Sequence, residues 1–179
     1  YSNIAQLVRQ TILEIGYDNS HKGFDGRTCG VQVSIGDQSE DIATGVDDAV
    51  ASRGLAEADR YDQQGAGDQG TMFGYASTDT PVLMPLPIHL AHRLSERLTQ
   101  VRRSGEYAGI RPDGKTQVTI GYDGDRPVTV DAVVLSTQHE PGVGLDELRE
   151  AMTQLVIRPV LAEHAPELDA SGASIYVNP

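Results

Sequence analysis

Apolar residues recur at helical spacing near the start of the chain. The stripe consists of Ile4, Leu7, Val8, Ile12 and Ile15. This spacing predicts an amphipathic helix from Ser2 to Ile15, because side chains three and four residues apart share one face of a helix. Ser2 is a suitable N-cap for this helix, and Gly16 is a suitable end.

Two more helices are expected further along the chain. The first is predicted over 88–103 by Leu90, Leu94, Leu98 and Val101. The second is predicted over 145–157 by Leu145, Leu148, Met152, Leu155 and Val156. Pro159 follows the second helix and is expected to mark its end, since proline cannot donate a backbone hydrogen bond.

Alternating apolar and polar positions predict strands between these helices. One is expected over Cys29–Ile35, one around Val118 and Ile120, and one over 128–135. The turn residues Asp123-Gly124-Asp125 would join the last two into a hairpin. Ser174–Val177 is expected to form a further strand. Interleaved helices and hairpins favour an α+β fold with mixed or antiparallel sheets, and the similar order of elements around the first two strands indicates a weak internal repeat.

The composition and charge of the chain disfavour some classes of function. The formal net charge of −12 disfavours a general nucleic-acid binder, because phosphates would be repelled. No apolar run approaches the roughly 18 residues that a membrane span needs. The acidity is concentrated between residues 36 and 68, which hold nine carboxylates against two arginines. Only Lys22 and Lys115 are lysines, and the single cysteine, Cys29, is consistent with a reducing compartment.

The strongest local motif is Gly65-Ala66-Gly67-Asp68-Gln69-Gly70, followed by Met72-Phe73-Gly74-Tyr75. Glycines allow the backbone to approach a ligand closely, and Asp68 supplies a carboxylate. The spacing differs from that of a Walker loop, and the motif lacks the preceding strand of a dinucleotide-binding site. Taken alone, the motif favours a glycine-rich turn with a solvated aspartate.

Together with other segments, this motif resembles the S-adenosylmethionine synthetase (methionine adenosyltransferase) family. The other segments are Gly23-Phe24-Asp25, Ile35 to Ile42, Val82-Leu83-Met84-Pro85, Ala91-His92-Arg93-Leu94, Arg111-Pro112-Asp113-Gly114-Lys115 and Val134 to His139. The resemblance implies a fold of repeated α/β domains with mixed or antiparallel sheets.

The resemblance covers part of the family's length. The His-Pro-Asp-Lys and Gly-Gly-Gly-Ala-Phe-Ser segments of the family are absent, and the sequence starts at Tyr1 without methionine. We therefore expect an internal piece of a longer protein. Residues 1–48 would end the amino-terminal domain and include a gate loop, 49–172 would form the central domain, and 173–179 would be the first strand of the carboxy-terminal domain.

The family reaction joins ATP and L-methionine: the methionine sulfur attacks C5′ of ATP, and the released tripolyphosphate is hydrolysed to phosphate and pyrophosphate. The resemblance assigns ATP contacts to Asp113, Gly114 and Lys115, with Lys115 stabilising charge on the phosphates. It assigns Asp68 a catalytic and methionine-binding role, and Gln38 a methionine contact. It further implies a flexible gate that contains Gln38, Ser39, Glu40, Asp41, Ile42, Gly45 and Asp48, although the stretch 49–64 is longer than usual.

The resemblance also implies Mg²⁺ and K⁺, whose ligands are expected outside this segment, and a cytoplasmic homodimer with shared active sites that assembles into a homotetramer. Taken alone, 1–179 is expected to be inactive. For single motifs, a structural role without any catalytic or binding function remains an alternative. Pro112 to Lys115 is a common type I turn sequence, and His89, His92 and His139 are expected to be structural or at an interface, with His21 and His164 exposed.

Two other functions are weighed. A noncatalytic regulatory or assembly partner could have kept the fold, although retention of Gln38, Asp68 and Lys115 disfavours it. An unrelated acidic nucleotide-binding domain would require a fold other than repeated α/β units.

Overall fold

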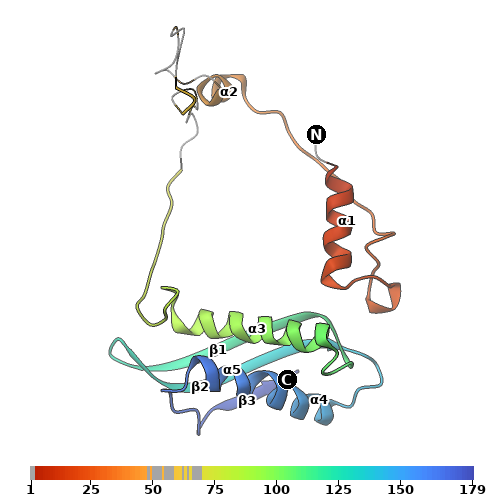
Figure 1. Ribbon diagram of the computed structural model, residues 1–179, viewed down its shortest axis with the longest axis vertical. Helices are drawn as coiled ribbons and strands as arrows, with labels where there is room; N and C mark the ends of the chain where they lie inside the picture. The colour runs from red at the N-terminus through yellow and green to blue at the C-terminus, as the bar shows by residue number, and fades with distance from the viewer. Residues whose placement is uncertain are drawn as a thin grey trace. The chain divides into compact units, whose positions relative to one another are not determined.

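The computed structural model describes residues 3–47, 49, 54, 59–61, 63, 65 and 70–179. The chain divides into two compact units, one of residues 1–30 with 75–179 and one of residues 31–74. Figure 1 shows the elements of both units. They are α1 (Ile4–Ile15), η1 (Ser20–Lys22), α2 (Glu40–Asp47), α3 (Leu86–Ser104), β1 (Ile110–Asp123), β2 (Arg126–His139), α4 (Leu145–Met152), η2 (Thr153–Ile157), α5 (Arg158–His164) and β3 (Ser174–Val177).

The larger unit contains a three-stranded mixed sheet in the order β1-β2-β3. Strands β1 and β2 form the expected antiparallel hairpin, and β3 pairs with β2 in parallel. Gly124 in the hairpin turn has φ +62°, a left-handed conformation that glycine adopts without strain. The α+β class is confirmed, as are the predicted helix over 88–103 and the strand Ser174–Val177, although α3 begins earlier, at Leu86.

The core lies between the sheet and the helices α3, α4 and α5. Helix α3 packs on β1, and both α5 and η2 pack on α3; Figure 1 shows α3 running along the hairpin. Leucines of α3 meet the apolar side chains of β2 and of the α4–α5 segment. Fully buried members are Leu90, Leu94, Val101, Val130, Val133, Leu135, Leu148, Met152, Val156 and Ile157. Each contributes about 1.5–3 kcal/mol of apolar burial.

The helical segment that starts at Leu145 does not end at Pro159, contrary to the sequence-based expectation. It passes through the π-helical turn η2 and continues as α5 to His164. Pro159 lacks the N–H that would bond the carbonyl of Leu155, four residues earlier. The Nε of Arg97 donates to that carbonyl instead, at 2.8 Å, and the Arg97 Nη2 also bonds both carboxylate oxygens of Glu106. A side chain of α3 therefore supplies the hydrogen bond that proline removes.

Helix α1 is held by its carboxyl end. Arg102 and Arg103 donate to the carbonyls of Ile15 and Glu14, at 2.8 and 3.0 Å. These cations complement the negative end of the helix dipole. Gly16 ends the helix as expected, with φ +120°, and a Cβ there would lie 2.7 Å from the Arg102 guanidinium.

The N-cap of α1 is Asn3, whose side chain accepts from the backbone N–H of Gln6. The expected N-cap, Ser2, lies outside the described residues. Leu7 of the apolar stripe is 60% exposed, and no residue of α1 is buried.

The expected strand Cys29–Ile35 is not formed, because residues 29–35 belong to no regular element. Val33 and Ile35 are 49% and 73% exposed. A strand is stable only when its backbone pairs with another strand, and no described strand pairs with this stretch. The first copy of the proposed internal repeat therefore lacks its strand.

Among the described residues, no helix combines the length and the apolar composition that crossing a bilayer requires.

Candidate functional site

The segment Asp113-Gly114-Lys115 lies inside strand β1 and is not a type I turn. Gly114 pairs with Thr137 and Lys115 pairs with Ser136 of β2. A register irregularity lies between Ile110 and Gly114, where Pro112 can be accommodated without a ladder hydrogen bond. The long hairpin therefore overrides the local turn preference of Pro-Asp-Gly.

An ion pair secures the start of this strand. Arg111 Nη2 lies 2.7 Å from Glu140 Oε2, and Arg111 Nε donates to Glu140 Oε1 at 3.1 Å. The Arg111 guanidinium holds the pKa of the Glu140 carboxyl below its usual value. The N–H of Glu140 also donates to the carbonyl of Gly109. The start of β1, close to Asp113 and Lys115, is therefore joined to the end of β2.

Strand alternation separates the two faces of the segment. A Cβ on Gly114 would lie 2.6 Å from Leu98 of α3, and Thr116 Oγ1 donates to the carbonyl of Ala91 at 2.7 Å. These residues therefore face α3, and Lys115 projects on the opposite, exposed face. Within the described part of the chain, neither the Asp113 carboxylate nor the Lys115 ammonium has a hydrogen-bond or ion-pair partner, so both charges are available to a ligand.

The segment Ser136-Thr137-Gln138-His139 is structural in this unit. The backbone N–H of Thr137 donates to Asn178 Oδ1 at 2.7 Å, and Asn178 Nδ2 donates to the Thr137 carbonyl at 2.9 Å. His139 Nδ1 lies 2.9 Å from the Glu140 carbonyl. Asn178 extends the pairing of β2 beyond β3 through its side chain.

Gln138 joins the hairpin to the segment after α1. Its Nε2 donates to the carbonyl of Lys22 at 3.0 Å, whereas its Oε1 is buried and accepts no hydrogen bond from the described residues. Lys22 in turn bonds the Gly16 carbonyl and pairs with Asp18. Lys22 therefore has a structural role, which leaves Lys115 as the lysine with an available charge.

The gate candidates lie in the other unit. Gln38 is exposed and precedes α2, whose first turn carries Glu40 and Asp41. The carbonyl of Ser39 accepts the first bond of this helix, from Ala43. Ile42 is 40% exposed on α2. Two candidates, Asp48 and Asp68, lie outside the described residues.

The structure thus brings Asp113, Gly114 and Lys115 together on β1 and places Gln38 to Gly45 on and before α2. The two sets belong to different units, and each is described on its own.

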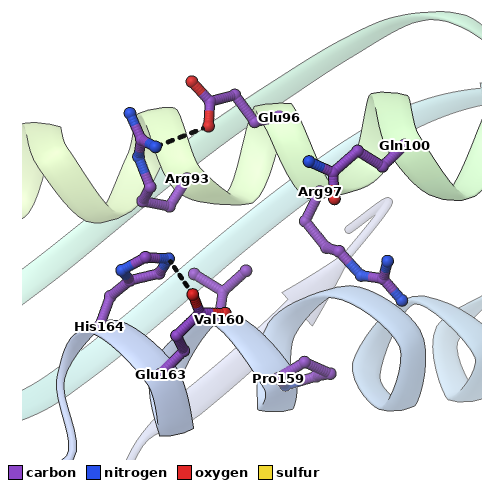
Figure 2. A pocket seen from close by; sticks show the side chains of 8 residues that line it. All are labelled: Arg93, Glu96, Arg97, Gln100, Pro159, Val160, Glu163 and His164. Carbon is purple, nitrogen blue, oxygen red and sulfur yellow. Dashed lines mark ion pairs between the residues drawn. The ribbon is translucent and has the colours of Figure 1, made fainter.

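Charged side chains of α3 and α5, among them Arg93, Arg97, Glu163 and His164, line a groove of about 340 Å³, shown in Figure 2. The ring of His89 meets that of His164 edge to face, with centroids 5.7 Å apart. Burial is the main cause that lowers the pKa of His89, with Arg93 next. His164 is partly buried, contrary to the expected exposure, whereas His21 is exposed as expected.

The charges of this groove are already neutralised. Arg93 pairs with Glu96 at 2.9 Å, and Arg97 pairs with Glu106 at 3.0 Å. His164 lies 3.7 Å from Glu163. We therefore assign the groove a structural role in joining α3 to α5.

Comparison with known proteins decides the family. Residues 63–179 match the model of the S-adenosylmethionine synthetase central domain, over more than half of the chain. The chain belongs to the S-adenosylmethionine synthetase family. The match includes β1 with Asp113, Gly114 and Lys115, and it extends through β3.

Curated relatives of the S-adenosylmethionine synthetase family align with the whole chain. It is 59% identical to an S-adenosylmethionine synthase of Mycolicibacterium gilvum (strain PYR-GCK) and 56% identical to one of Nocardia farcinica (strain IFM 10152), over 181 and 182 residues. All of this chain is covered, but only 45% of each relative. The chain thus spans less than half the length of these synthases.

The family resemblance implies Mg²⁺ and K⁺ for the S-adenosylmethionine synthetases. Among the residues that the structure describes, no three His, Cys, Asp or Glu side chains gather as metal ligands do. The described residues therefore do not form a metal site of their own.

Proposed function

We propose that this chain provides part of the ATP and methionine site of an S-adenosylmethionine synthetase. In the proposed reaction, the sulfur of L-methionine attacks C5′ of ATP, and the C5′–O bond to the triphosphate breaks. Water then cleaves the tripolyphosphate into phosphate and pyrophosphate. The observation that carries the proposal is Lys115, an exposed ammonium that pairs with none of the described carboxylates and lies on a strand that matches the synthetase family.

Lys115 is proposed to stabilise charge on the leaving tripolyphosphate. A lysine ammonium is a compact point charge, and charge that develops in the transition state is best stabilised by a group already held in place. The pairing of β1 with β2 supplies that support, since Lys115 lies opposite Ser136 in the ladder. Asp113 is proposed to accept a hydrogen bond from a ribose hydroxyl, and Gly114 keeps the strand close to α3.

Gln38 and Asp68 are proposed to bind methionine, with Asp68 near the amino group or the developing sulfonium. The stretch Gln38 to Asp48 would close over the reactants and exclude water. The Mg²⁺ and K⁺ ligands are proposed to lie in parts of the synthase outside this chain. We also propose a cytoplasmic homodimer with shared active sites that assembles into a homotetramer. The domain boundaries are proposed to lie at residues 48 and 172.

The role of Lys115 is tested in the full-length protein. Lys115→Ala should lower the single-turnover rate of S-adenosylmethionine formation by about 100- to 1,000-fold, as loss of one group that stabilises transition-state charge does in other enzymes. Lys115→Arg should restore part of the rate, because charge is kept but the geometry differs. An unchanged chemical step in Lys115→Ala would refute the role.

Arg158→Ala is the matched control, since it also removes one positive charge. Arg158 is exposed on α5, and within the described residues its guanidinium donates only to Gln154 Oε1, at 3.5 Å. Its single-turnover rate should equal that of the wild type. A loss similar to that of Lys115→Ala would mean that net charge, and not a group on β1, governs the rate.

A further inference from the structure

The pairing of β1 with β2 is interrupted near the start of β1, between Ile110 and Gly114. β1 has more residues than β2 across this interruption, and residues 111–113 have no partner in the ladder. Pro112 lies in this stretch and has no backbone N–H to donate. Because such irregularities bend a strand and re-aim the side chains beside them, the first part of β1 needs an anchor other than the ladder.

One ion pair bridges the interruption. Glu140, which directly follows β2, accepts from Arg111 Nη2 at 2.7 Å and from Arg111 Nε at 3.1 Å. Two parallel bonds of this kind fix the orientation of a guanidinium as well as its distance. The backbone N–H of Glu140 donates to the carbonyl of Gly109 at 2.9 Å. Glu140 therefore holds β1 on both sides of Ile110, once through its backbone and once through its carboxylate.

The two cations at the start of β1 differ in what they contact. Arg111 is engaged by Glu140, and its side chain is only 13% exposed. An ion pair that is partly shielded from water is screened less by salt than a fully exposed pair. The Lys115 ammonium is exposed and has no ion-pair partner among the described residues. Arg111 is therefore suited to holding the strand, whereas Lys115 is available to the proposed polyphosphate.

Lys115 lies close to the interruption, so its place depends on how firmly the start of β1 is held. It is the second residue of the ladder after the interruption, opposite Ser136. Pairs at the end of a ladder open most easily when nothing beyond them holds the strand. We propose that Arg111 and Glu140 are positioning residues: their ion pair keeps the start of β1 closed, so that the Lys115 ammonium is preorganised for the polyphosphate. This inference rests on the proposed function of Lys115.

A double-mutant cycle tests whether Glu140 acts through Lys115. In the full-length protein, Glu140→Ala should lower the single-turnover rate about 10- to 100-fold, as small misplacements in an active site do. The KM for methionine should stay close to that of the wild type, because an interaction made only in the transition state affects kcat. In a Lys115→Ala background, Glu140→Ala should cost at most about twofold, because the group that it positions is already absent. An equal loss in both backgrounds would overturn the inference, since a general structural role does not depend on Lys115.

Glu106→Ala is the matched control. Glu106 accepts two hydrogen bonds from Arg97 at 3.0 Å, so this variant also removes one carboxylate and one ion pair. Because α3, and not β1, carries Arg97, the single-turnover rate should equal that of the wild type. A loss as large as that of Glu140→Ala would overturn the inference, because any broken ion pair of this unit would then lower the rate.

Glu140→Gln is a second variant, which keeps the size of the side chain and one acceptor oxygen but removes the charge. It should lower the rate by a smaller factor than Glu140→Ala, because a hydrogen bond to a neutral acceptor is weaker than one to a carboxylate. If Glu140→Ala does not fold, the same cycle with Glu140→Gln decides the inference.

Hydrogen exchange tests the ion pair without any need for activity. In Glu140→Ala, protection of the amides of residues 114–116 should fall at least about fivefold, whereas the amides of residues 118–120 should keep theirs. Unchanged protection at residues 114–116 would overturn the inference. If the wild-type full-length protein makes no S-adenosylmethionine, the proposed function fails, and hydrogen exchange alone decides whether the ion pair holds the strand.

Discussion

His89 is a titratable side chain held almost fully inside the core, with 8% exposure. Burial is the largest cause that lowers its pKa below the ordinary 6.5; the positive charges of Arg93, His164 and His92 act in the same direction, and Glu96 opposes them. The unfolded chain therefore takes up a proton near pH 6.5, whereas the folded chain does so only at lower pH. We expect the free energy of unfolding to fall as pH drops below about 6.5, by at most about 1.4 kcal/mol per pH unit. His89→Gln should flatten this part of the pH profile in thermal or urea unfolding.

His92→Gln is the control for that experiment, because His92 is exposed one helical turn away. It should leave the pH profile close to that of the wild type. An equal slope in wild type and His89→Gln between pH 5 and 7 would show that other groups govern the acid dependence.

The π-helical turn between α4 and α5 depends on one arginine. Arg97→Ala should lower the free energy of unfolding by about 2 kcal/mol, because it removes the bonds to the Leu155 carbonyl and to Glu106. Pro159→Ala supplies a backbone N–H that can serve Leu155. In that background, Arg97→Ala should cost about 1 kcal/mol less. Urea unfolding of the four proteins measures the coupling, and equal costs in both backgrounds would contradict it.

These elements show where local patterns suffice and where they do not. The stripe of α3 and the turn at Gly124 predict their elements because the deciding residues are neighbours in sequence. The turn preference of Pro112 to Lys115 is overridden by pairing with β2. The continuation of the helical segment past Pro159 depends on Arg97, whose hydrogen bond to the Leu155 carbonyl spans 58 positions of the sequence. Contacts between residues so far apart in the sequence cannot be predicted from local periodicity.

The candidate site also has one part that local sequence patterns predict and one part that they do not. The exposure of Lys115 follows from strand alternation once β1 is known. A Cβ on Gly65 would collide with the carbonyl oxygens of Gly45 and Val46 in α2, about twenty positions earlier in the sequence. The glycine-rich motif alone predicts a close approach of the backbone to a ligand, and it does not predict this contact with the end of a helix.

The proposed active site draws on more than this chain, which spans 45% of its synthase relatives. We expect residues 1–179 alone to form no measurable S-adenosylmethionine, because the family's His-Pro-Asp-Lys and Gly-Gly-Gly-Ala-Phe-Ser segments are absent from this sequence. Detection of product from purified 1–179, beside the full-length protein at equal concentration, tests this. Turnover similar to that of the full-length protein would show that residues 1–179 suffice for the reaction.

The parallel pairing of β3 with β2 has a consequence for how the larger unit folds. The β1–β2 hairpin closes through a tight turn, so its contacts are local in sequence and are made at little entropic cost. Strand β3 reaches the sheet only after the chain has passed through α4, η2 and α5. Its contacts require a long loop to close first. We therefore expect the edge that Asn178 fastens to Thr137 to form late in folding, after the hairpin that carries Lys115.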